Sequence, residues 1–312
     1  MPLLWVVIPC FNEEQVLPET SKRLAQVMRS LVEQGKIDPE SKIVYVDDGS
    51  KDNTWKLIEE MHHADAMFMG IHLSRNFGHQ NALLAGLMTA KEHADISISM
   101  DADLQDDIGV IEKFVALYQE GNEVVYGVRK SRDGDTFFKK HSAQQFYKFM
   151  SFLGVELVYN HADCRLLGKR ALEALSQYPE VNLFLRGMVP QLGYRHTTVE
   201  YERGKRYAGE SKYPLKKMLR FAFEGITSFS IKPIRFITMT GVFFLGICIV
   251  LIIYFLIRYF THNTVSGWTS TVMSIWTLGS IQLISIGTIG EYIGKTYLET
   301  KHRPKYIIDE II

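Results

Sequence analysis

Short apolar runs alternate with helix-length amphipathic segments along the first two-thirds of the chain. Most of these runs are apolar at the majority of their positions, which is typical of strands in a parallel sheet that is buried on both faces. The alternation therefore predicts an α/β domain over residues 1–213, with a mostly parallel sheet between layers of helices. The predicted strands are 4–8, 42–46, 69–73, 96–100 and 123–128, and the predicted helices are 14–33, 54–62, 78–93 and 108–120.

Two long apolar stretches follow this domain, at residues 236–257 and 268–290. They hold 22 and 23 residues without Lys, Arg, Asp or Glu. At about 1.5 Å per residue, each would cross a hydrocarbon core about 30 Å thick as a helix, which predicts a two-helix transmembrane hairpin over 233–294. Residues 214–232 place apolar side chains at helical spacing with basic residues between them, which predicts an interfacial amphipathic helix. Packing of that helix against the globular domain is the alternative.

Charge is balanced overall but not locally. The chain has 35 basic and 35 acidic residues, so no global field indicates binding to nucleic acid. Nine basic residues against two acidic ones lie between Arg203 and Arg235, where they would face anionic lipid head groups. Basic residues also follow the second stretch, in the tail 295–312, whereas the linker 259–267 carries no charge. The positive-inside rule then predicts a multi-pass protein of the cell membrane, with the globular domain and the tail on the cytoplasmic face.

Polar residues follow four of the predicted strands, and the carboxyl ends of parallel strands share one edge of a sheet. The strand at 96–100 leads into Asp101, Asp103 and Gln105, which alternate along backbone that we expect to be extended. Hard oxygen ligands of this kind suit Mg²⁺ or Mn²⁺ bridging a diphosphate. An acidic pair that merely caps a helix or lines a loop is the alternative.

Two further segments belong to the same edge of the predicted sheet. Asp47 and Asp48 follow the second strand, where a carboxylate can accept hydrogen bonds from a base or ribose, and Asn76 follows the third strand. A turn with a helix cap at Asp52 or Asn53 is the alternative for the second strand's loop. The first strand–helix turn lacks G-x-G-x-x-G, so dinucleotide binding of the Rossmann kind has no support.

Several motifs together resemble the inverting family-2 glycosyltransferases. They are Pro9-Cys-Phe-Asn-Glu-Glu14, Val46-Asp-Asp-Gly-Ser50, Ser74-Arg-Asn-Phe-Gly-His79, Asp101-Ala-Asp-Leu-Gln105, Asp163-Cys-Arg-Leu166, Arg186-Gly187 and the run from Arg203 to Tyr213. With the paired C-terminal apolar stretches, the chain is similar to the polyprenyl-phosphate glycosyltransferases, bacterial relatives of dolichyl-phosphate mannose synthase. The resemblance implies a GT-A fold, a Rossmann-like nucleotide-diphospho-sugar transferase domain.

The resemblance also implies roles for individual residues. It implies a nucleotide-sugar site at Pro9, Asn12, Glu13, Asp47, Asp48, Asn76 and Asp101, a divalent cation at Asp101, Asp103 and Gln105, and an acceptor-phosphate site at Arg203, Arg206, Ser211 and Lys212. Asp163 is implied as the catalytic carboxylate. Because a phosphate monoester with a second pKa of about 6 needs little deprotonation, we expect Asp163 to orient a partner such as Arg165, or to position the acceptor, more than to abstract a proton as a general base. An Asp–Arg pair that only steadies a loop is the alternative.

The expected reaction is inverting transfer of a sugar from UDP-glucose or a UDP-N-acetylhexosamine to polyprenyl (undecaprenyl) phosphate. Its product would be a β-linked lipid-phosphate sugar for cell-envelope glycosylation. The expected partners are the nucleotide sugar, the polyprenyl phosphate and membrane lipid, and small residues in the second apolar stretch would permit a homo-oligomer. An inactive, membrane-anchored sugar-nucleotide-binding scaffold is one alternative. A processive polysaccharide synthase is another, although its Gln-x-x-Arg-Trp motif is absent from the sequence.

Overall fold

The computed structural model describes residues 1–130, 161–181, 183–202 and 267–312, with seven isolated positions between 234 and 253. The chain divides into two compact units. One comprises residues 1–148, 156–214 and 303–312, and it holds the sheet and the helices that cover it. The other comprises 149–155 and 215–302, and its described part contains the long helix α10 (Trp268–Thr300).

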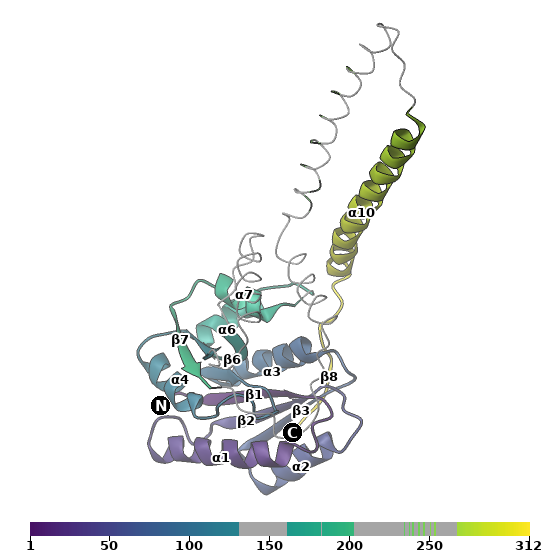
Figure 1. Cartoon of the computed structure of the whole chain (residues 1–312). Coiled ribbons are helices and arrows are strands. Elements are labelled where there is room, and N and C mark those ends of the chain that lie inside the picture. The colour runs from purple at the N-terminus through teal and green to yellow at the C-terminus, as the bar shows by residue number, and fades with distance from the viewer. Residues whose placement is uncertain are drawn as a thin grey trace. The chain divides into compact units, whose positions relative to one another are not determined.

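The sheet-bearing unit is an α/β structure (Figure 1). Its strands are β1 (Leu4–Cys10), β2 (Lys42–Asp47), β3 (Phe68–Leu73), β4 (Ile96–Ser99), β5 (Val124–Arg129), β6 (His161–Gly168), β7 (His196–Tyr201) and β8 (Ile308–Ile311). Its described helices are α1 (Leu17–Glu33), α2 (Thr54–Ala64), α3 (His79–His93), α4 (Val110–Gln119), α6 (Lys169–Ser176) and α7 (Leu185–Gln191).

The eight strands lie in the order β7-β5-β6-β4-β1-β2-β3-β8. The central strands β4, β1, β2 and β3 are parallel, as are β5 and β7. The antiparallel strand β6 joins these two groups, and β8 runs antiparallel along the outer edge of β3. The expected α/β class with a mostly parallel sheet is confirmed.

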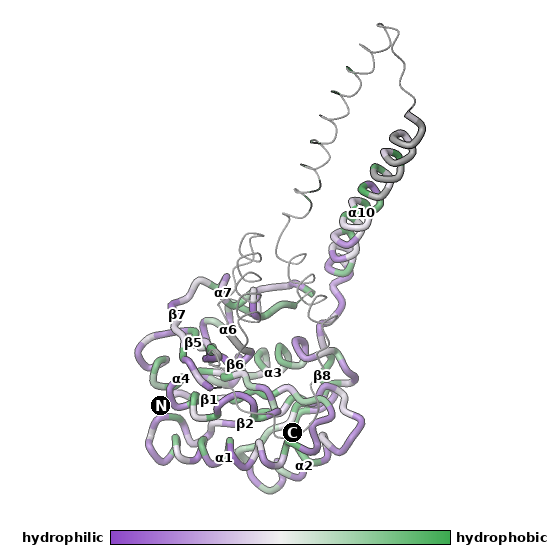
Figure 2. The backbone as a smooth tube through the Cα atoms, viewed as in Figure 1, coloured by the Kyte–Doolittle hydropathy of each residue, from purple (hydrophilic) through white to green (hydrophobic). Residues whose placement is uncertain are grey.

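Helices cover both faces of this sheet. Leu4, Val6 and Ile8 of β1 pack into the core that is shared with α1, α2 and α4, whereas α3 covers the other face of β1 together with α6 (Figure 1). Every residue of β1 is therefore buried, which explains why its sequence is continuously apolar rather than alternating. Along α1, hydrophobic and hydrophilic positions alternate with the period of a helix that is buried on one side (Figure 2).

All five strands and all four helices predicted from the pattern are present, with ends displaced by a few residues. The pattern did not predict β6, β7, β8, α6 or α7. The C-terminal tail, for which no strand was predicted, forms β8. This happens because the outer edge of β3 offers unpaired backbone groups, which the segment satisfies by strand pairing.

The predicted membrane segments have different outcomes. Residues 268–290 fall within α10, which continues to Thr300. Among the residues that the structure describes, no helix combines the length and the apolar character required of a membrane span. Apart from isolated positions, the predicted first span at 236–257 lies outside the described residues, and so does the amphipathic helix predicted at 214–232.

The close approach of α3 to the sheet generates the first prediction. A Cβ added at Gly86 would overlap with Val7 of β1 and lie 2.7 Å from Cγ2 of Val46. Gly86→Ala is therefore expected to lower the free energy of unfolding by about 1–3 kcal/mol, measured by urea unfolding. Gly287→Ala is the control, because a Cβ there would have no neighbour within 4 Å among the described residues. Equal stability of the two variants would contradict the packing described.

Candidate active site

Loops after the four central parallel strands form one edge of the sheet, which we call the rim (residues 11–16, 48–53, 74–78 and 100–109). Ligands of open α/β sheets bind beyond the carboxyl ends of the strands. Three of the predicted site segments lie at the carboxyl ends of the central parallel strands: Asp47 ends β2, the segment with Asn76 follows β3, and Asp101 follows β4. Pro9 lies within β1, opposite Val46.

Asp47 is a fully buried carboxylate at the last position of β2. Its Oδ2 accepts a hydrogen bond from the backbone N–H of Ser50 at 3.2 Å and lies 2.8 Å from Nδ1 of His72. The His72 ring in turn packs against Trp55, with 4.7 Å between ring centroids. Oδ1 of Asp47 has no hydrogen-bond partner among the described residues. Such buried acceptors are uncommon in folded proteins, and an incoming donor would satisfy this one.

Asp48 joins the loop after β2 to the loop after β3. Its Oδ1 accepts the backbone N–H of Phe77 at 2.6 Å, and its Oδ2 accepts that of Gly78 at 2.9 Å. Burial raises the pKa of Asp48 above its ordinary value, although the two amides favour the charged form. The loops also touch at Gly49, which has φ +66°, where an added Cβ would lie 2.6 Å from the carbonyl carbon of Arg75. Glycine is therefore required at this position.

The loop after β1 is tied to the loop after β2. Asn12 has a left-handed backbone with φ 55°, and its N–H donates to Oγ of Ser50 at 2.9 Å. Its side-chain Oδ1 accepts the N–H of Lys51 at 2.8 Å, and the N–H of Glu13 donates to Oγ1 of Thr54 at 2.9 Å. In this structure, Asn12 and Glu13 hold the neighbouring loop in place.

The helix-cap alternative is correct for part of the loop after β2. Oδ1 of Asp52 accepts the backbone N–H of Thr54 at the start of α2, at 3.1 Å. That cap explains Asp52, but not the contact of Asp47 with His72 of β3 or the bonds of Asp48 to the loop after β3.

The expectation of extended backbone from Asp101 to Gln105 is wrong. The strand β4 ends at Ser99, and the chain then turns at residues 102–103. Leu104 has φ 56°, a left-handed conformation that non-glycine residues rarely adopt. The reason is local, because Oδ1 of Asp103 accepts the backbone N–H of Gln105 at 3.1 Å and so closes the turn.

Distant side chains hold the two ends of this turn. Oγ1 of Thr20, in α1, donates to the carbonyl oxygen of Ala102 at 2.8 Å. The hydroxyl group of Tyr201, at the end of β7, donates to Oδ1 of Asp106 at 2.6 Å. The Asp101–Asp106 segment is therefore held in one conformation by groups from opposite parts of the sheet unit.

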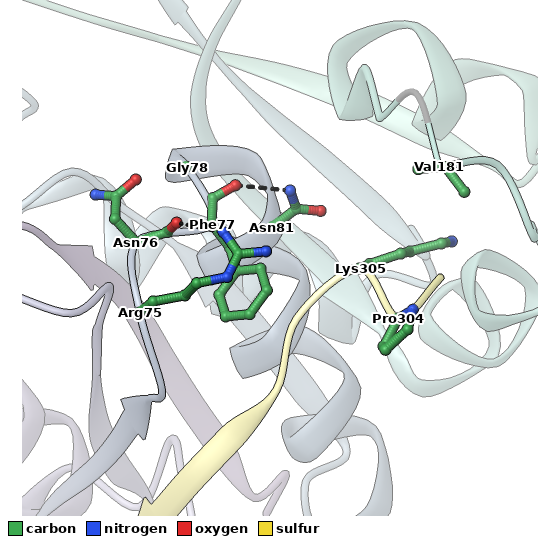
Figure 3. Close-up of a pocket in the computed structure, with 8 residues that line it drawn as sticks. All are labelled: Arg75, Asn76, Phe77, Gly78, Asn81, Val181, Pro304 and Lys305. Atoms are coloured by element: carbon green, nitrogen blue, oxygen red, sulfur yellow. Dashed lines mark hydrogen bonds between the residues drawn. The ribbon is translucent and has the colours of Figure 1, made fainter. Parts of the chain in front are cut away.

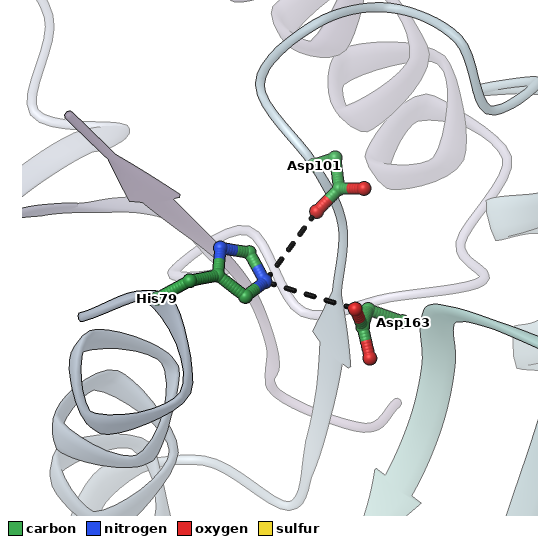
Figure 4. Close-up of side chains that lie close together, drawn as sticks. All are labelled: His79, Asp101 and Asp163. Carbon is green, nitrogen blue, oxygen red and sulfur yellow. Dashed lines mark ion pairs between the residues drawn. The ribbon is translucent and has the colours of Figure 1, made fainter. Parts of the chain in front are cut away.

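His79 lies between Asp101 and Asp163 (Figure 4). Its Nε2 is 3.7 Å from a carboxylate oxygen of each. Burial lowers the pKa of His79, but the two carboxylates outweigh that effect and leave it above the ordinary value. Burial is also the main reason that the pKa of Asp101 is raised to about 6; His79 opposes this rise and the surrounding carboxylates add to it. In the sequence, His79 stands near the start of the helix predicted at 78–93, and no local signal indicates that it lies between two carboxylates.

Asp163 is buried and paired with two arginines. Its Oδ1 accepts from Nη2 of Arg165 at 3.1 Å and from Nε of Arg186 at 3.0 Å, and its Oδ2 accepts from Nη2 of Arg186 at 2.8 Å. Burial alone would raise the pKa of Asp163, but the contact with His79 and the charges of the arginines hold it well below its usual range. Asp163 therefore accepts a proton poorly. The expected partnership with Arg165 is present, and the bidentate pair with Arg186 was not foreseen.

A divalent cation would suit the oxygen atoms around Asp101. Ligand atoms of His79, Asp101 and Asp163 lie within 4.8 Å of one another, but Asp163 is already neutralised by two guanidinium groups. Asp101 is different, because burial and the neighbouring carboxylates raise its pKa, and a bound cation would stabilise its charged form. The buried Asp103 lies two residues further along, in the turn that follows. These donors fit Mg²⁺ or Mn²⁺.

A cavity of about 350 Å³ opens beside the loop after β3 (Figure 3). It is lined by Arg75, Asn76, Phe77, Gly78, Asn81, Val181, Pro304 and Lys305. Asn76, a predicted nucleotide-site residue, is therefore part of its wall. Pro304 and Lys305 of the C-terminal segment, which were not predicted to lie near the site, also line it. The predicted acceptor-phosphate residues Arg203, Arg206, Ser211 and Lys212 lie outside the described residues.

Known proteins resemble this chain along nearly its whole length. A family model described as Glycosyl transferase family 2 matches residues 5–176. A protein of Bacillus subtilis (strain 168), named as an uncharacterized glycosyltransferase, is 54% identical over 308 residues, which are 99% of this chain and 91% of the relative. A bactoprenol glucosyl transferase of Shigella phage SfV is 38% identical over 308 residues, 97% of each chain.

Solved structures are more distant. Glucosyl-3-phosphoglycerate synthase from Mycobacterium tuberculosis, in complex with Mn²⁺, UDP and phosphoglyceric acid, is 19% identical. The likeness covers 72% of this chain and 76% of that one, with a TM-score of 0.49. At this distance neither the ligands nor the reaction of that synthase carries over to this chain.

The buried pairing of Asp163 generates the second prediction. Asp163→Asn leaves Arg165, whose side chain is 1% exposed, without its compensating charge. The free energy of unfolding is therefore expected to fall by about 3 kcal/mol or more. Adding Arg165→Met to that variant is expected to restore part of the loss, because the orphaned charge is then removed. Urea unfolding of the two single variants and the double variant measures the coupling, and strictly additive losses would contradict the pairing.

Proposed function

This chain belongs to glycosyl transferase family 2 and is a glycosyltransferase, and on that premise we propose that it transfers a sugar from a nucleotide sugar to a polyprenyl phosphate. One observation carries the proposal: Asp101, suited to a divalent cation, lies 3.7 Å from His79, and His79 also contacts Asp163, which holds the guanidinium of Arg186. A diphosphate leaving group and a phosphate acceptor both require such cationic surroundings.

The nucleotide sugar is assigned to the β1–β3 part of the rim. There, Oδ1 of Asp47 is a buried acceptor that a base or ribose donor would satisfy. The motifs at this part of the rim also supply Pro9, Asn12, Glu13, Asp48 and Asn76. Asn12, Glu13 and Asp48 hold the loops there in place. The donor is proposed to be UDP-glucose or a UDP-N-acetylhexosamine, transferred with inversion to a β-linkage.

The catalytic part of the rim binds and orients charged groups. A divalent cation held by Asp101, Asp103 and Gln105 would offset the negative charge that develops on the leaving diphosphate. Asp163 holds the guanidinium of Arg186 at two points, so Arg186 is preorganised toward phosphate oxygens. The acceptor, mostly dianionic at pH 7, needs no strong base. Asp163 is therefore a positioning residue for Arg186 and Arg165.

A polyprenyl acceptor agrees with the relatives named for bactoprenol glucosyl transfer. The basic residues Arg203, Arg206 and Lys212, with Ser211, are proposed to bind its phosphate. The hairpin at 233–294 and the amphipathic helix at 214–232 are proposed to anchor the enzyme in the cell membrane, with the catalytic domain on the cytoplasmic face. A homo-oligomer remains a prediction from the small residues of the second stretch.

The third prediction concerns the cation and the reaction. The purified enzyme, incubated with UDP-sugars, Mg²⁺ or Mn²⁺ and undecaprenyl phosphate, is expected to yield a lipid product one hexose or N-acetylhexosamine heavier, detected by mass spectrometry. EDTA should abolish the product. Asp103→Asn should lower turnover at least about a hundredfold, since an amide is a weaker and uncharged ligand.

Asp107→Asn is the matched control for that experiment. Asp107 is an exposed carboxylate in the same loop, and its Oδ1 accepts the N–H of Gly109 at 2.9 Å, which an asparagine oxygen can also do. This variant should keep nearly full turnover. Undiminished activity in EDTA would refute the cation, and donor binding without any lipid product would favour the inactive scaffold.

The fourth prediction concerns topology. In a chain whose native cysteines have been replaced, a cysteine at Ser266 is expected to react with a membrane-impermeant thiol reagent in intact cells, because the uncharged linker should lie outside. A cysteine at Arg303, an exposed position, is expected to react only after permeabilisation. The reverse pattern would separate the rim from cytoplasmic nucleotide sugars, and the proposed location would then be wrong.

A further inference from the structure

The C-terminal strand β8 is an integral part of the sheet. It pairs antiparallel with β3, so that Ile311 faces Ile71 and Glu310 faces His72. At its end, Ile312 and Gly70 exchange two backbone hydrogen bonds of 2.9 and 3.0 Å. The contact is close, since a Cβ on Gly70 would lie 2.9 Å from Cγ1 of Ile312. β8 therefore covers β3 along most of its length.

β3 and the loop that follows it supply partners to Asp47 and Asp48, and β8 pairs with that strand. His72, opposite Glu310 in the ladder, is the residue whose ring nitrogen contacts Asp47. Immediately after β3, the N–H of Ser74 donates to the carbonyl oxygen of Ile307 at 3.1 Å. Three residues further on, the amides of Phe77 and Gly78 bind Asp48.

The segment just before β8 also reaches the rim. Pro304 and Lys305 form one side of the cavity whose other side is the loop after β3 (Figure 3). Nζ of Lys305 donates to the carbonyl oxygen of Tyr178 at 2.8 Å, which fixes the segment at this place. The C-terminal residues thus contact the loop after β3 from two directions, along the strand and across the cavity.

We propose that residues 304–312 are a positioning element of the nucleotide site: by pairing with β3 they hold His72 and the loop after β3 in the arrangement that binds the donor. The inference rests on the proposed function, because it assumes that Asp47, Asp48 and Asn76 receive the nucleotide. A strand that only protects a sheet edge would stabilise the fold without affecting donor affinity. The two roles can therefore be separated.

The experiment uses Glu310, whose side chain is exposed, in the full-length protein. Glu310→Pro removes a backbone donor from the ladder, whereas Glu310→Ala removes the side chain alone. Binding of UDP and of the UDP-sugar is measured by calorimetry, and the KM values for donor and lipid acceptor are measured separately. Glu310→Pro is expected to raise the Kd for UDP and the donor KM by about tenfold, because the loop must then be ordered on binding. Glu310→Ala should stay within about twofold of the wild type, and the acceptor KM should not change in either variant.

A stability control excludes a merely structural effect. Ile37→Ala empties a fully buried position in the loop that leads into β2, at the end of the sheet away from the rim. It should lower the unfolding temperature without changing the Kd for UDP. If Glu310→Pro does not fold, Ile312→Ala takes its place, with hydrogen exchange of the Phe77 and Gly78 amides as a direct measure of the loop. Faster exchange together with weaker UDP binding supports the proposal.

Failure of the positioning role and failure of the proposed function would give different results. Lower stability with an unchanged Kd for UDP in Glu310→Pro or Ile312→Ala would overturn the positioning role and leave the proposed function intact. A wild-type protein that binds no uridine nucleotide under any of these conditions would overturn the proposed donor itself.

Discussion

A buried carboxylate needs a partner, since its charge is costly to remove from water, and the arrangement of the rim follows from how each carboxylate obtains one. Asp48 takes two backbone amides, Asp163 takes two guanidinium groups, and Asp47 takes a histidine that is held by Trp55. Among the described residues, Asp101 has the more distant His79 as its charged partner, and burial raises its pKa. The carboxylate that the chain itself compensates least is thus the one best suited to a cation.

These pairings also determine the conformation of the loops. The two amides that bind Asp48 belong to the loop after β3. The loop after β2 approaches that loop so closely at Gly49 that no side chain would fit between them. A displacement of one loop would therefore uncover a buried charge in the other, which makes the rim cooperative rather than a set of independent segments. Because β8 pairs with the same strand that carries His72, the cooperativity extends to the C-terminal residues.

The sequence predicted the parts of this structure whose signals are local. Continuous apolar runs revealed β1 to β5, because strands buried on both faces have no polar side. The short antiparallel strand β8 was missed because four residues carry little pattern, and its pairing with β3 is a tertiary event. These carboxylates were found by type and position, and Arg165 was expected beside Asp163, but their other partners were not predicted. Backbone amides have no sequence signature, and nothing local links Asp163 to Arg186, 23 residues away, or His72 to Asp47, 25 residues away.

The pairing of Asp163 also bears on the chemistry of acceptor activation. A carboxylate that is held by three guanidinium hydrogen bonds, with its pKa well below the usual range, is a poor general base at neutral pH. A hydroxyl acceptor would need a base at this place, whereas a phosphate monoester is already a nucleophile there. The geometry is therefore better matched to a phosphate acceptor than to an alcohol. For the same reason, a substitution at Arg186 is more informative about the acceptor than one at Asp163. Arg186→Lys would keep the positive charge but lose the two-point hydrogen bonding that orients it.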